Sequence, residues 1–425
     1  MSSQARQYLS GLLQAPRRNV QRIAEVVPDA DAQALHHFLA HSPWDARAVM
    51  DQVARDVSSL LGGDQDSCLL LDETCFPKKG RKSVGVARQW MGLEGKTDNC
   101  QVAVFAALAR GKSVSLIDAE LYLPKEWVQD PSRCDVAGVP SERKVLKTKP
   151  ALALELVQRA RRNGVRFAWV AADAGYGQDR ALLRSLAQAG ETFVFDVQRS
   201  QKIFLAEPSH PQRRTNPSNP ESPASVRVDE WAAQQPAEAW HKVFVRHASQ
   251  GDLQLEALRC RVWLLEGKDS EAYCWQLIIT REVGNPETIK YSLTNASESL
   301  PVQRLCYMQR QRYWVERAFQ EAKNEAGLDE YQARSWPAWY HHMALAMMAL
   351  LFLLRERHLQ KEALPLLSAK DVKILLAQFL PRRDQDPDEL IRQMQLRHQQ
   401  RQSAIDSAYR RQKLRTQGPE GNLTK

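Results

Sequence analysis

Two aspartates stand at the ends of apolar, strand-like segments. Asp72 ends the run Ser67–Asp72 (SCLLLD), and Asp173 ends Phe167–Asp173 (FAWVAAD), where it opens the turn Asp-Ala-Gly-Tyr-Gly. The glycines let the backbone turn sharply past the carboxylate. An acid at a strand end is often only a turn or cap residue. Two such ends on one sheet nevertheless predict carboxylates that converge on a divalent cation, because hard cations prefer oxygen ligands.

A third acid comes from the helical segment at residues 309–331 (QRQRYWVERAFQEAKNEAGLDEY). Its apolar stripe has helical spacing: Val315, Phe319, Ala322 and Ala326. At roughly 100° per residue, Arg312, Glu316 and Lys323 form a second stripe beside it, while Glu321 and Glu325 fall on the far side. Arg312 and Glu316 are an i,i+4 pair, so a solvated ion-pair face is one interpretation. Because this strip borders the buried stripe, Glu316 is predicted as the third acid, at the lip of the core.

These residue types predict chemistry at phosphorus. Two metal ions held by carboxylates activate an oxygen nucleophile and stabilise the leaving oxygen of an in-line displacement. Arg312 and Lys323, on the same face as Glu316, would bind non-bridging phosphate oxygens, bidentately in the case of Arg. The combination favours phosphodiester chemistry on a nucleic acid.

The segments that must position these acids begin with strands and continue as alternating helices and strands. Four strand-like runs predict an antiparallel meander: Ser67–Asp72, Val84–Trp90, Val102–Leu108 and Val114–Leu123. Helix, strand, helix and strand are then predicted in turn: Lys149–Asn163, Phe167–Asp173, Arg180–Ala189 and Thr192–Val197. This order predicts an α/β fold, a mixed sheet with helices packed on it.

The flanking regions differ from this core. Residues 1–62 are predicted to be all-α, and the pair of helices around Ser42-Pro43 fits either a helix-turn-helix or a small bundle. The stretch 240–293 is rich in strands and predicts a small antiparallel sheet inserted before the helix of Glu316. The tail 389–417 holds seven Arg or Lys, typical of a solvated helix or of an arm for the phosphate backbone.

We therefore expect five units along the chain. They are a helical region at 1–62, the first part of the core at 63–200, a β-rich insertion at 201–300, the second part of the core at 301–375 and a basic tail at 376–425.

Composition narrows the class of protein. The chain has 425 residues, 43% of them apolar, with 59 Lys and Arg against 50 Asp and Glu, a net charge of +9. Seven cysteines without a C-x-x-C pair favour reduced thiols in a cytosol-like compartment. The longest apolar run, Met343–Leu354, is shorter than the ~18 residues that span a bilayer and predicts a buried core helix. The start of the chain lacks the apolar stretch of a secretory signal. We expect a cytoplasmic protein, and the basic excess permits a nucleic-acid partner without naming one.

Longer motifs surround the candidate acids. The most specific are DETCFPKKG at 72–80, SVGVARQW at 83–90 and GKTDNCQ at 95–101. Supporting ones are HFLAHSPWD at 37–45, LYLPKEW at 121–127, ADAGYG at 172–177 and the helix of Glu316. In these motifs, from about residue 15 to 355, the sequence resembles DDE-type insertion-sequence transposases. The group is insertion-sequence family seven-hundred-and-one, whose catalytic domain is a DDE superfamily endonuclease.

The resemblance implies an RNase H-like fold with Asp72, Asp173 and Glu316 as the catalytic, metal-binding triad. It also implies a β-rich insertion between the second Asp and the Glu. The signature Tyr-x2-Arg-x3-Glu-x6-Lys of the wider superfamily is matched by Arg312, Glu316 and Lys323, with Gln309 at the Tyr position. The implied reaction is hydrolysis at the transposon ends to free a 3′-OH, which then attacks target DNA. Two Mg²⁺ or Mn²⁺ ions, double-stranded DNA and a homodimer on that DNA are implied with it.

Further DNA contacts follow from the resemblance. Tyr176 in the turn after Asp173 is a candidate phosphate-binding residue. A basic group just after Asp72 either contacts phosphates or forms a solvated turn: Lys78, Lys79, Arg81 and Lys82. Relatives hold their ends through a DNA hairpin and flip a base onto an aromatic residue of the insertion. The available tryptophans, for which core packing is the other explanation, are Trp231, Trp240, Trp263 and Trp275.

Three alternatives stay open at this point. A metal-dependent endonuclease would keep the fold and the triad but cut without strand transfer. A non-catalytic DNA-binding protein descended from a transposase would have no need to keep all three acids. A scaffold protein would carry the acids only as surface features.

Overall fold

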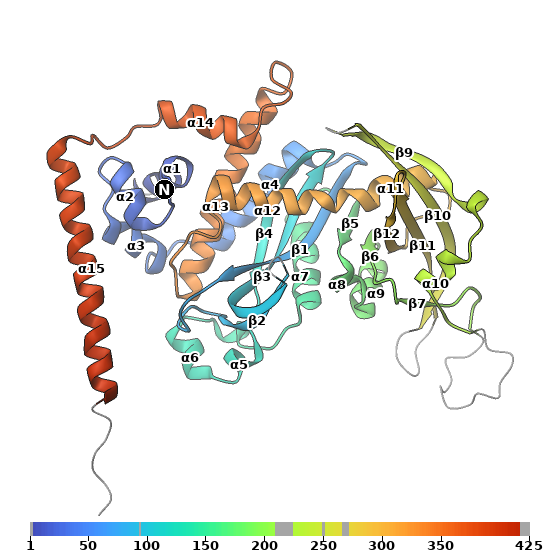
Figure 1. The fold of residues 1–425 in the computed structure, drawn as a ribbon, viewed down its shortest axis with the longest axis horizontal. Helices are drawn as coiled ribbons and strands as arrows, with labels where there is room; N and C mark the ends of the chain where they lie inside the picture. Colours follow the sequence, from blue (N-terminus) through green and yellow to red (C-terminus); the bar gives the residue numbers. More distant parts are fainter. Residues whose placement is uncertain (1–2, 93–94, 209–223, 249–250, 266–271, 417–425) are drawn as a thin grey trace, which may run out of the picture.

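The computed structural model describes residues 3–92, 95–208, 224–248, 251–265 and 272–416 (Figure 1). Its centre is a ten-stranded mixed sheet in the order β2-β3-β1-β5-β6-β12-β11-β10-β9, with β4 paired to β3 outside this path. Its strands are β1 (Ser67–Pro77), β2 (Ala87–Met91), β3 (Lys96–Arg110), β4 (Ser113–Leu121), β5 (Trp169–Ala172), β6 (Phe193–Asp196), β9 (His241–Ala248), β10 (Gly251–Leu265), β11 (Ala272–Glu282) and β12 (Asn285–Thr294). A separate two-stranded sheet pairs β7 (Lys202–Ile203) with β8 (Val226–Arg227).

Helices cover the sheet and form the two ends of the chain. The longer ones are α1 (Ser3–Gln14), α2 (Val20–Val26), α3 (Ala32–Ala40), α4 (Ala46–Leu61), α7 (Lys149–Arg162), α9 (Arg180–Gln188), α11 (Val302–Gln311), α12 (Tyr313–Ala326), α13 (Trp336–Leu359), α14 (Ala369–Phe379) and α15 (Pro387–Thr416). Shorter ones are α5 (Lys125–Val128), α6 (Pro131–Val136), α8 (Ala174–Gly177) and α10 (Val228–Ala233), with 3₁₀ turns at Ser141–Arg143 and Ala237–Ala239.

The first half of the sheet has the predicted strands, but the prediction of a simple meander was wrong for β2. β3 pairs antiparallel with β1, β2 and β4, so among the described strands β2 pairs with β3 and not with β1. β5 then adds parallel to β1, and β6 adds parallel to β5. β5 and β6 are short and almost entirely buried, which suits parallel strands covered on both faces. The α/β class, the mixed sheet with flanking helices and the all-α N-terminal region are confirmed.

The strand-rich insertion differs from its prediction in one respect. Its hairpins are antiparallel as expected, but β12 also pairs with β6, so the insertion continues the core sheet. The prediction of an antiparallel inserted sheet therefore holds for its pairing, but the inserted strands extend the core sheet and do not form a small sheet of their own. Because β6 would otherwise be an edge strand with unpaired backbone groups, β12 removes an exposed edge.

Helix α13 forms the centre of the helical layer beside the sheet. It packs against α1, α4, α12 and β4, and the side chain of Tyr8 on α1 hydrogen-bonds His342 Nδ1 at 2.8 Å. Within the described residues α13 is the one helix long and apolar enough to cross a membrane, but 72% of its most apolar window is buried inside the protein. The prediction of a buried core helix here is confirmed.

The N-terminal helices belong to the same core. Met50, Val53 and Val57 of α4 are buried where this helix meets α13 and β4. A recognition helix of a helix-turn-helix must present its side chains to a groove of DNA. Since α4 is instead packed against α13 and β4, the packing favours the bundle interpretation for this region.

Candidate functional site

Asp72 and Asp173 lie side by side where β5 ends; β1 itself continues to Pro77, so the prediction that its strand ends at Asp72 was wrong. Leu71 of β1 pairs with Ala172 of β5, so the residue that follows each of them is an aspartate at the same edge. Asp173 also caps α8, because its Oδ1 accepts hydrogen bonds from the backbone N–H of Gly175 at 2.9 Å and of Tyr176 at 3.4 Å. The structure therefore brings together the two acids that the sequence singled out at strand ends.

This proximity is electrostatically unfavourable. Burial raises the pKa of Asp72 to about 7, and the neighbouring charge of Asp173 adds to the effect. Burial likewise raises the pKa of Asp173, against the opposing charge of Arg312. Two carboxylates that resist ionising together create a place where added positive charge is favourable.

Arg312 supplies part of that charge. It lies between α11 and α12, which the sequence predicted as one helix but which the structure interrupts at this residue. Its Nη1 lies 3.6 Å from Asp72 Oδ2, its Nε lies 3.3 Å from Asp196 Oδ2, and its Nη2 donates to Glu316 Oε1 at 2.8 Å. Burial disfavours the guanidinium charge, but the acids, Asp196 first, outweigh it and raise the pKa of Arg312.

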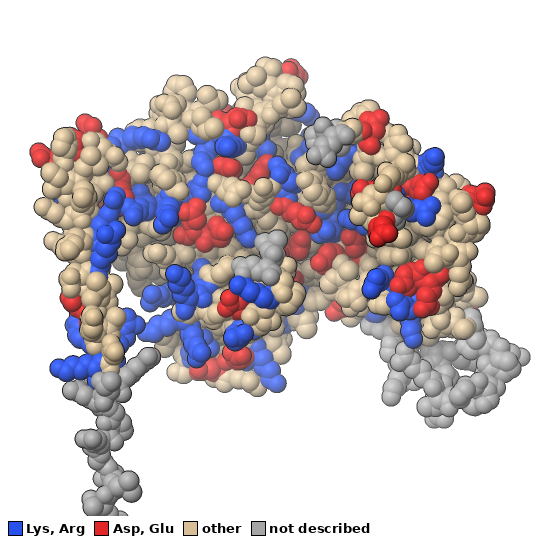
Figure 2. Space-filling view, in the orientation of Figure 1, with Lys and Arg blue, Asp and Glu red and all other residues tan. Residues whose placement is uncertain are grey.

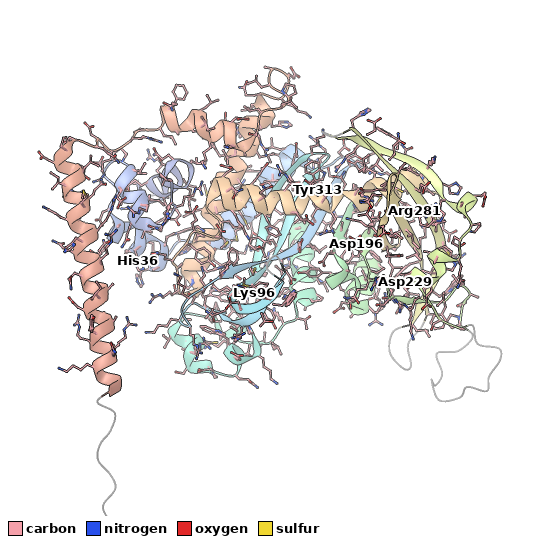
Figure 3. All side chains as sticks on the ribbon, in the orientation of Figure 1. His36, Lys96, Asp196, Asp229, Arg281 and Tyr313 are labelled. Carbon is pink, nitrogen blue, oxygen red and sulfur yellow. The ribbon has the colours of Figure 1, made fainter. Side chains whose placement is uncertain are left out.

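Asp196 was missed from the sequence. Ala172 pairs with Phe195, so Asp196, the last residue of β6, lies in the same row as Asp72 and Asp173. Its Oδ1 accepts a hydrogen bond from Ser292 Oγ of β12 at 2.6 Å, and Figure 3 shows it near the start of α12, where Tyr313 is labelled. The signal was present, since the predicted strand TFVFDV also carries an acid near its end.

Glu316 occupies the first turn of α12 and is the most exposed of these acids. Its side chain is 54% accessible, and Arg312 links it to Asp72 and Asp196. Glu321 and Glu325 point elsewhere, because they bind Arg357 and Lys373 of the C-terminal helices. The helical arithmetic that separated Glu316 from the other two acids agrees with this arrangement.

The donor set at the strand ends suits a hard divalent cation. Asp72 and Asp173 offer buried carboxylate oxygens without enough positive charge to balance them. In the described part of the chain, no group of three or more His, Cys, Asp or Glu side chains is assembled closely enough to hold a metal ion. Arg312 stands among the acids, so a third carboxylate could join the pair only if this guanidinium moved aside.

Tyr176 and Glu73 form a supporting pair beside the acids. The hydroxyl of Tyr176 donates to Glu73 Oε2 at 2.9 Å, and Lys149 of α7 binds the other oxygen of Glu73. Burial, followed by the charge of Glu73, raises the pKa of Tyr176 far above its usual value. The hydroxyl that was predicted to contact phosphate is thus bound to a carboxylate, and Glu73 is a second residue that sequence reasoning missed.

The predicted basic residues fall into three environments. Lys323 of α12 donates to Thr74 Oγ1 at 2.9 Å, two residues beyond Asp72 on β1. Lys78 lies over the ring of Tyr331 at 3.7 Å, and burial lowers its pKa to about 8. Lys79, Arg81 and Lys82 are exposed in the turn before β2. Figure 2 shows Lys and Arg gathered over β2, α5 and α6, the region to which this turn leads.

The insertion tryptophans are mostly engaged within the protein. Trp275 is buried against Phe193, and Trp240 is buried under the guanidinium of Arg281 at 3.9 Å. Trp231 and Trp263 are half-buried. Core packing therefore accounts for the first two, whereas Trp90 of β2, which the prediction did not include, is 61% exposed.

Comparison with known proteins places this chain in a family. Residues 1–252 match the family described as DDE superfamily endonuclease. The chain belongs to the DDE superfamily endonucleases. It is also 25% identical over 323 residues to the probable transposase for insertion sequence element IS701 of Microchaete diplosiphon. The matched residues cover 76% of this chain and 74% of that protein. The RNase H-like DDE class expected from the motifs is confirmed at this level.

Proposed function

We propose that this DDE superfamily endonuclease is a transposase, which cleaves DNA at the ends of its element and joins the freed 3′-OH to target DNA. The observation that carries the proposal is the row of acids on the adjacent strands β1, β5 and β6, of which Asp72 and Asp196 are linked through Arg312 to Glu316. Similarity to the IS701 transposase supports the same conclusion. Asp72, Asp173 and Glu316 are the proposed catalytic triad.

Two Mg²⁺ or Mn²⁺ ions held by this triad would activate the attacking oxygen and stabilise the leaving oxygen when bound. The protein's own groups position the DNA. Arg312 is poised to exchange its carboxylate contacts for non-bridging phosphate oxygens, which a guanidinium binds in a bidentate manner. Lys323 lies beside Thr74 on the same side and would bind a neighbouring phosphate as a point charge.

Supporting contacts would keep the acids in place during the reaction. Asp173 is fixed by the N–H groups of α8, and Asp196 is fixed by Ser292. Glu73 accepts the hydrogen bond of Tyr176 and so holds the turn that follows Asp173. In this proposal Tyr176 positions the backbone around Asp173 and acts on the DNA only through that position.

The test is an assay of end cleavage and strand transfer on DNA that carries the element's own termini. We expect Asp72→Asn, Asp173→Asn and Glu316→Gln to abolish both steps, and omission of the divalent metal to do the same. Glu321→Gln is the matched control, since its carboxylate is bound to Arg357 on another face. Normal cleavage by all three site variants would contradict the triad.

The same assay distinguishes the transposase from the second candidate function, a metal-dependent endonuclease that does not join DNA. The matched family is described as an endonuclease, which favours cleavage more directly than joining. A metal-dependent nuclease would release cut ends without joined products. A non-catalytic DNA-binding protein would bind the ends and cut in neither metal.

The proposed partners follow from the reaction. Terminal inverted repeats and target sites are double-stranded DNA, and the exposed Lys79, Arg81 and Lys82 would contact their phosphates. Two ends must be held together, so we propose a homodimer on DNA, acting in the bacterial cytoplasm at the nucleoid.

A further inference from the structure

The C-terminal helix α15 is covered on one side only. In Figure 1 it stands at the edge of the molecule beside the N-terminal helices, and its far end extends beyond them. Arg397 binds Glu25 at 2.8 Å, and Gln393 is the one buried residue among its described side chains. Because tertiary packing supplies most helical stability in proteins, a helix of this length with so little cover lacks a partner surface.

The uncovered side carries a repeat typical of paired helices. Its positions alternate at spacings of three and four residues: Ile391, Met394, His398, Arg401, Ile405 and Ala408. Met394 is 65% exposed and Ile405 is 47% exposed. Leu390 and Tyr409 flank the repeat at its two ends and are also exposed. We call these eight residues the α15 stripe.

Two copies of the α15 stripe are complementary to each other when the helices run antiparallel. When two copies are laid antiparallel about a point between Gln399 and Gln400, Ile391 faces Ala408 and Met394 faces Ile405. His398 then faces Arg401, which gives a polar centre between apolar layers. Polar residues at the core positions of paired helices specify register at a cost in stability. A contact in which the same patch serves both partners is the geometry of a two-fold dimer.

The charges of α15 favour the same orientation. Acids gather where the helix begins: Asp384, Asp386, Asp388 and Glu389. Bases gather toward its other end: Arg410, Arg411 and Lys413. An antiparallel pair sets the acidic end of each helix beside the basic end of the other, whereas a parallel pair sets like charges together.

We propose that α15 is a dimerisation helix, which pairs antiparallel through the α15 stripe with α15 of a second copy of this chain. The inference deepens the dimer of the proposed function by naming its surface, but the contact itself requires neither DNA nor catalysis. DNA is a poorer occupant of this side, because Ile391, Met394 and Ile405 offer nothing to a phosphate backbone.

The test measures the mass of the full chain in solution, without DNA, over a range of concentrations. We expect a dimer for the wild type and a rise of at least ~100-fold in its Kd for Met394→Glu with Ile405→Glu, because the pairing would bury unpaired charges. Leu396→Glu is the matched control, since Leu396 is 42% exposed but lies on the opposite side of α15. We expect this variant to dimerise as the wild type does, and circular dichroism checks that all variants are folded.

Cysteine cross-linking tests the orientation independently. A mixture of a Met394→Cys protein with an Ile405→Cys protein should form a disulfide-linked dimer, while each alone should not. In the antiparallel pair, two copies of residue 394 are separated by eleven residues, roughly 16 Å along the axis. The wild type controls for the native cysteines.

Three results would overturn the proposal. They are a monomeric wild type, a dimer that survives Met394→Glu with Ile405→Glu, and cross-linking of the single-cysteine proteins on their own. None of them bears on the triad, because cleavage is not measured. Conversely, inactive DNA assays would leave the pairing of α15 untouched.

Discussion

Two clusters of carboxylates and arginines in this protein use the same residue types in opposite ways. In the β4 cluster, Asp118 and Glu120 lie buried on β4 beneath Arg47, Arg143 and Arg159. In the site cluster, Asp72, Asp196 and Glu316 pair with the one guanidinium of Arg312, and Asp173 lies beside Asp72.

The carboxylates of the β4 cluster are fully paired. Asp118 receives Arg47 Nη1 and Arg159 Nε at 2.6 Å each, and Glu120 is bound by Arg143, Arg159 and the hydroxyl of Tyr340. Every carboxylate oxygen of these two buried acids therefore has a partner, and Arg47 and Arg143 also bind Asp51 and Glu155. Such a network fixes the packing of α4 and α7 on β4. It leaves no carboxylate oxygen available to bind a metal ion or a substrate.

The site cluster is left short of positive charge. Arg312 is 3.6 Å from Asp72 and 3.3 Å from Asp196, longer than the contacts of the β4 cluster. The deficit shows in the pKa of Asp72, raised to about 7 by burial and by the charge of Asp173. The balance of charges, rather than the presence of acids, therefore marks the candidate active site.

The largest expected effect is on the rate of DNA cleavage, which should depend on the site cluster. Asp72→Asn should lower the rate of end cleavage by about 10³-fold or more, since metal-ion stabilisation of a transition state contributes several kcal/mol. Its melting temperature should equal or exceed that of the wild type, because a repulsion between carboxylates is removed. If Asp72→Asn cleaves at the wild-type rate, the site cluster is not catalytic and does not differ in this way from the β4 cluster.

The second effect is on stability. Asp118→Ala should lower the free energy of unfolding by about 3 kcal/mol, because Arg47 and Arg159 lose a buried partner. Urea unfolding measures the change. Asp98→Ala is the control, since its solvent-exposed pair with Lys96 should contribute little to the free energy of unfolding. Equal losses in both variants would mean that the β4 cluster does not hold the fold.

A smaller effect tests the phosphate side of the site. Lys323→Ala should weaken binding of end DNA by ~10-fold and reduce its dependence on salt, because one phosphate contact is lost. Lys373→Ala offers the comparison, as Lys373 pairs with Glu325 away from the acids. If both variants bind alike, Lys323 does not face the DNA.

The smallest effect concerns pH in the metal-free protein. Asp72 has a folded pKa of about 7 against 3.8, so the folded state binds the proton more tightly and the wild type loses stability as the pH rises between these values. Asp72→Asn should therefore gain stability over the wild type as the pH rises from 4 to 7. We expect about 1–2 kcal/mol, allowing for partial exposure of the side chain. A difference that stays constant with pH would contradict the unfavourable pairing.

Local patterns predicted much of the fold and part of the site. Apolar runs followed by acids located β5 and the first part of β1, which continues past Asp72 to Pro77, and parallel pairing brought Asp72 and Asp173 together. Helical spacing was enough to set Glu316 on the side of Arg312 and to turn Glu321 and Glu325 away. These features depend on neighbours within a few residues of one another.

Features that depend on distant pairing were not predictable. The partner of β6 is β12, about a hundred residues later, and no local pattern selects that strand. For the same reason the sequence did not show that Asp196 completes the row or that Arg312 reaches two strands at once. Glu73 was missed because its role arises from Tyr176 and Lys149, which meet it only in the folded protein.

The most direct test of the site is a change of metal preference. Asp72→Cys replaces a hard oxygen ligand with a thiolate, which Mg²⁺ accepts poorly and the softer Mn²⁺ accepts better. If Asp72 binds the catalytic ion, this variant should not cleave end DNA in Mg²⁺ and should recover cleavage in Mn²⁺. Equal cleavage by Asp72→Cys in the two metals would contradict the account.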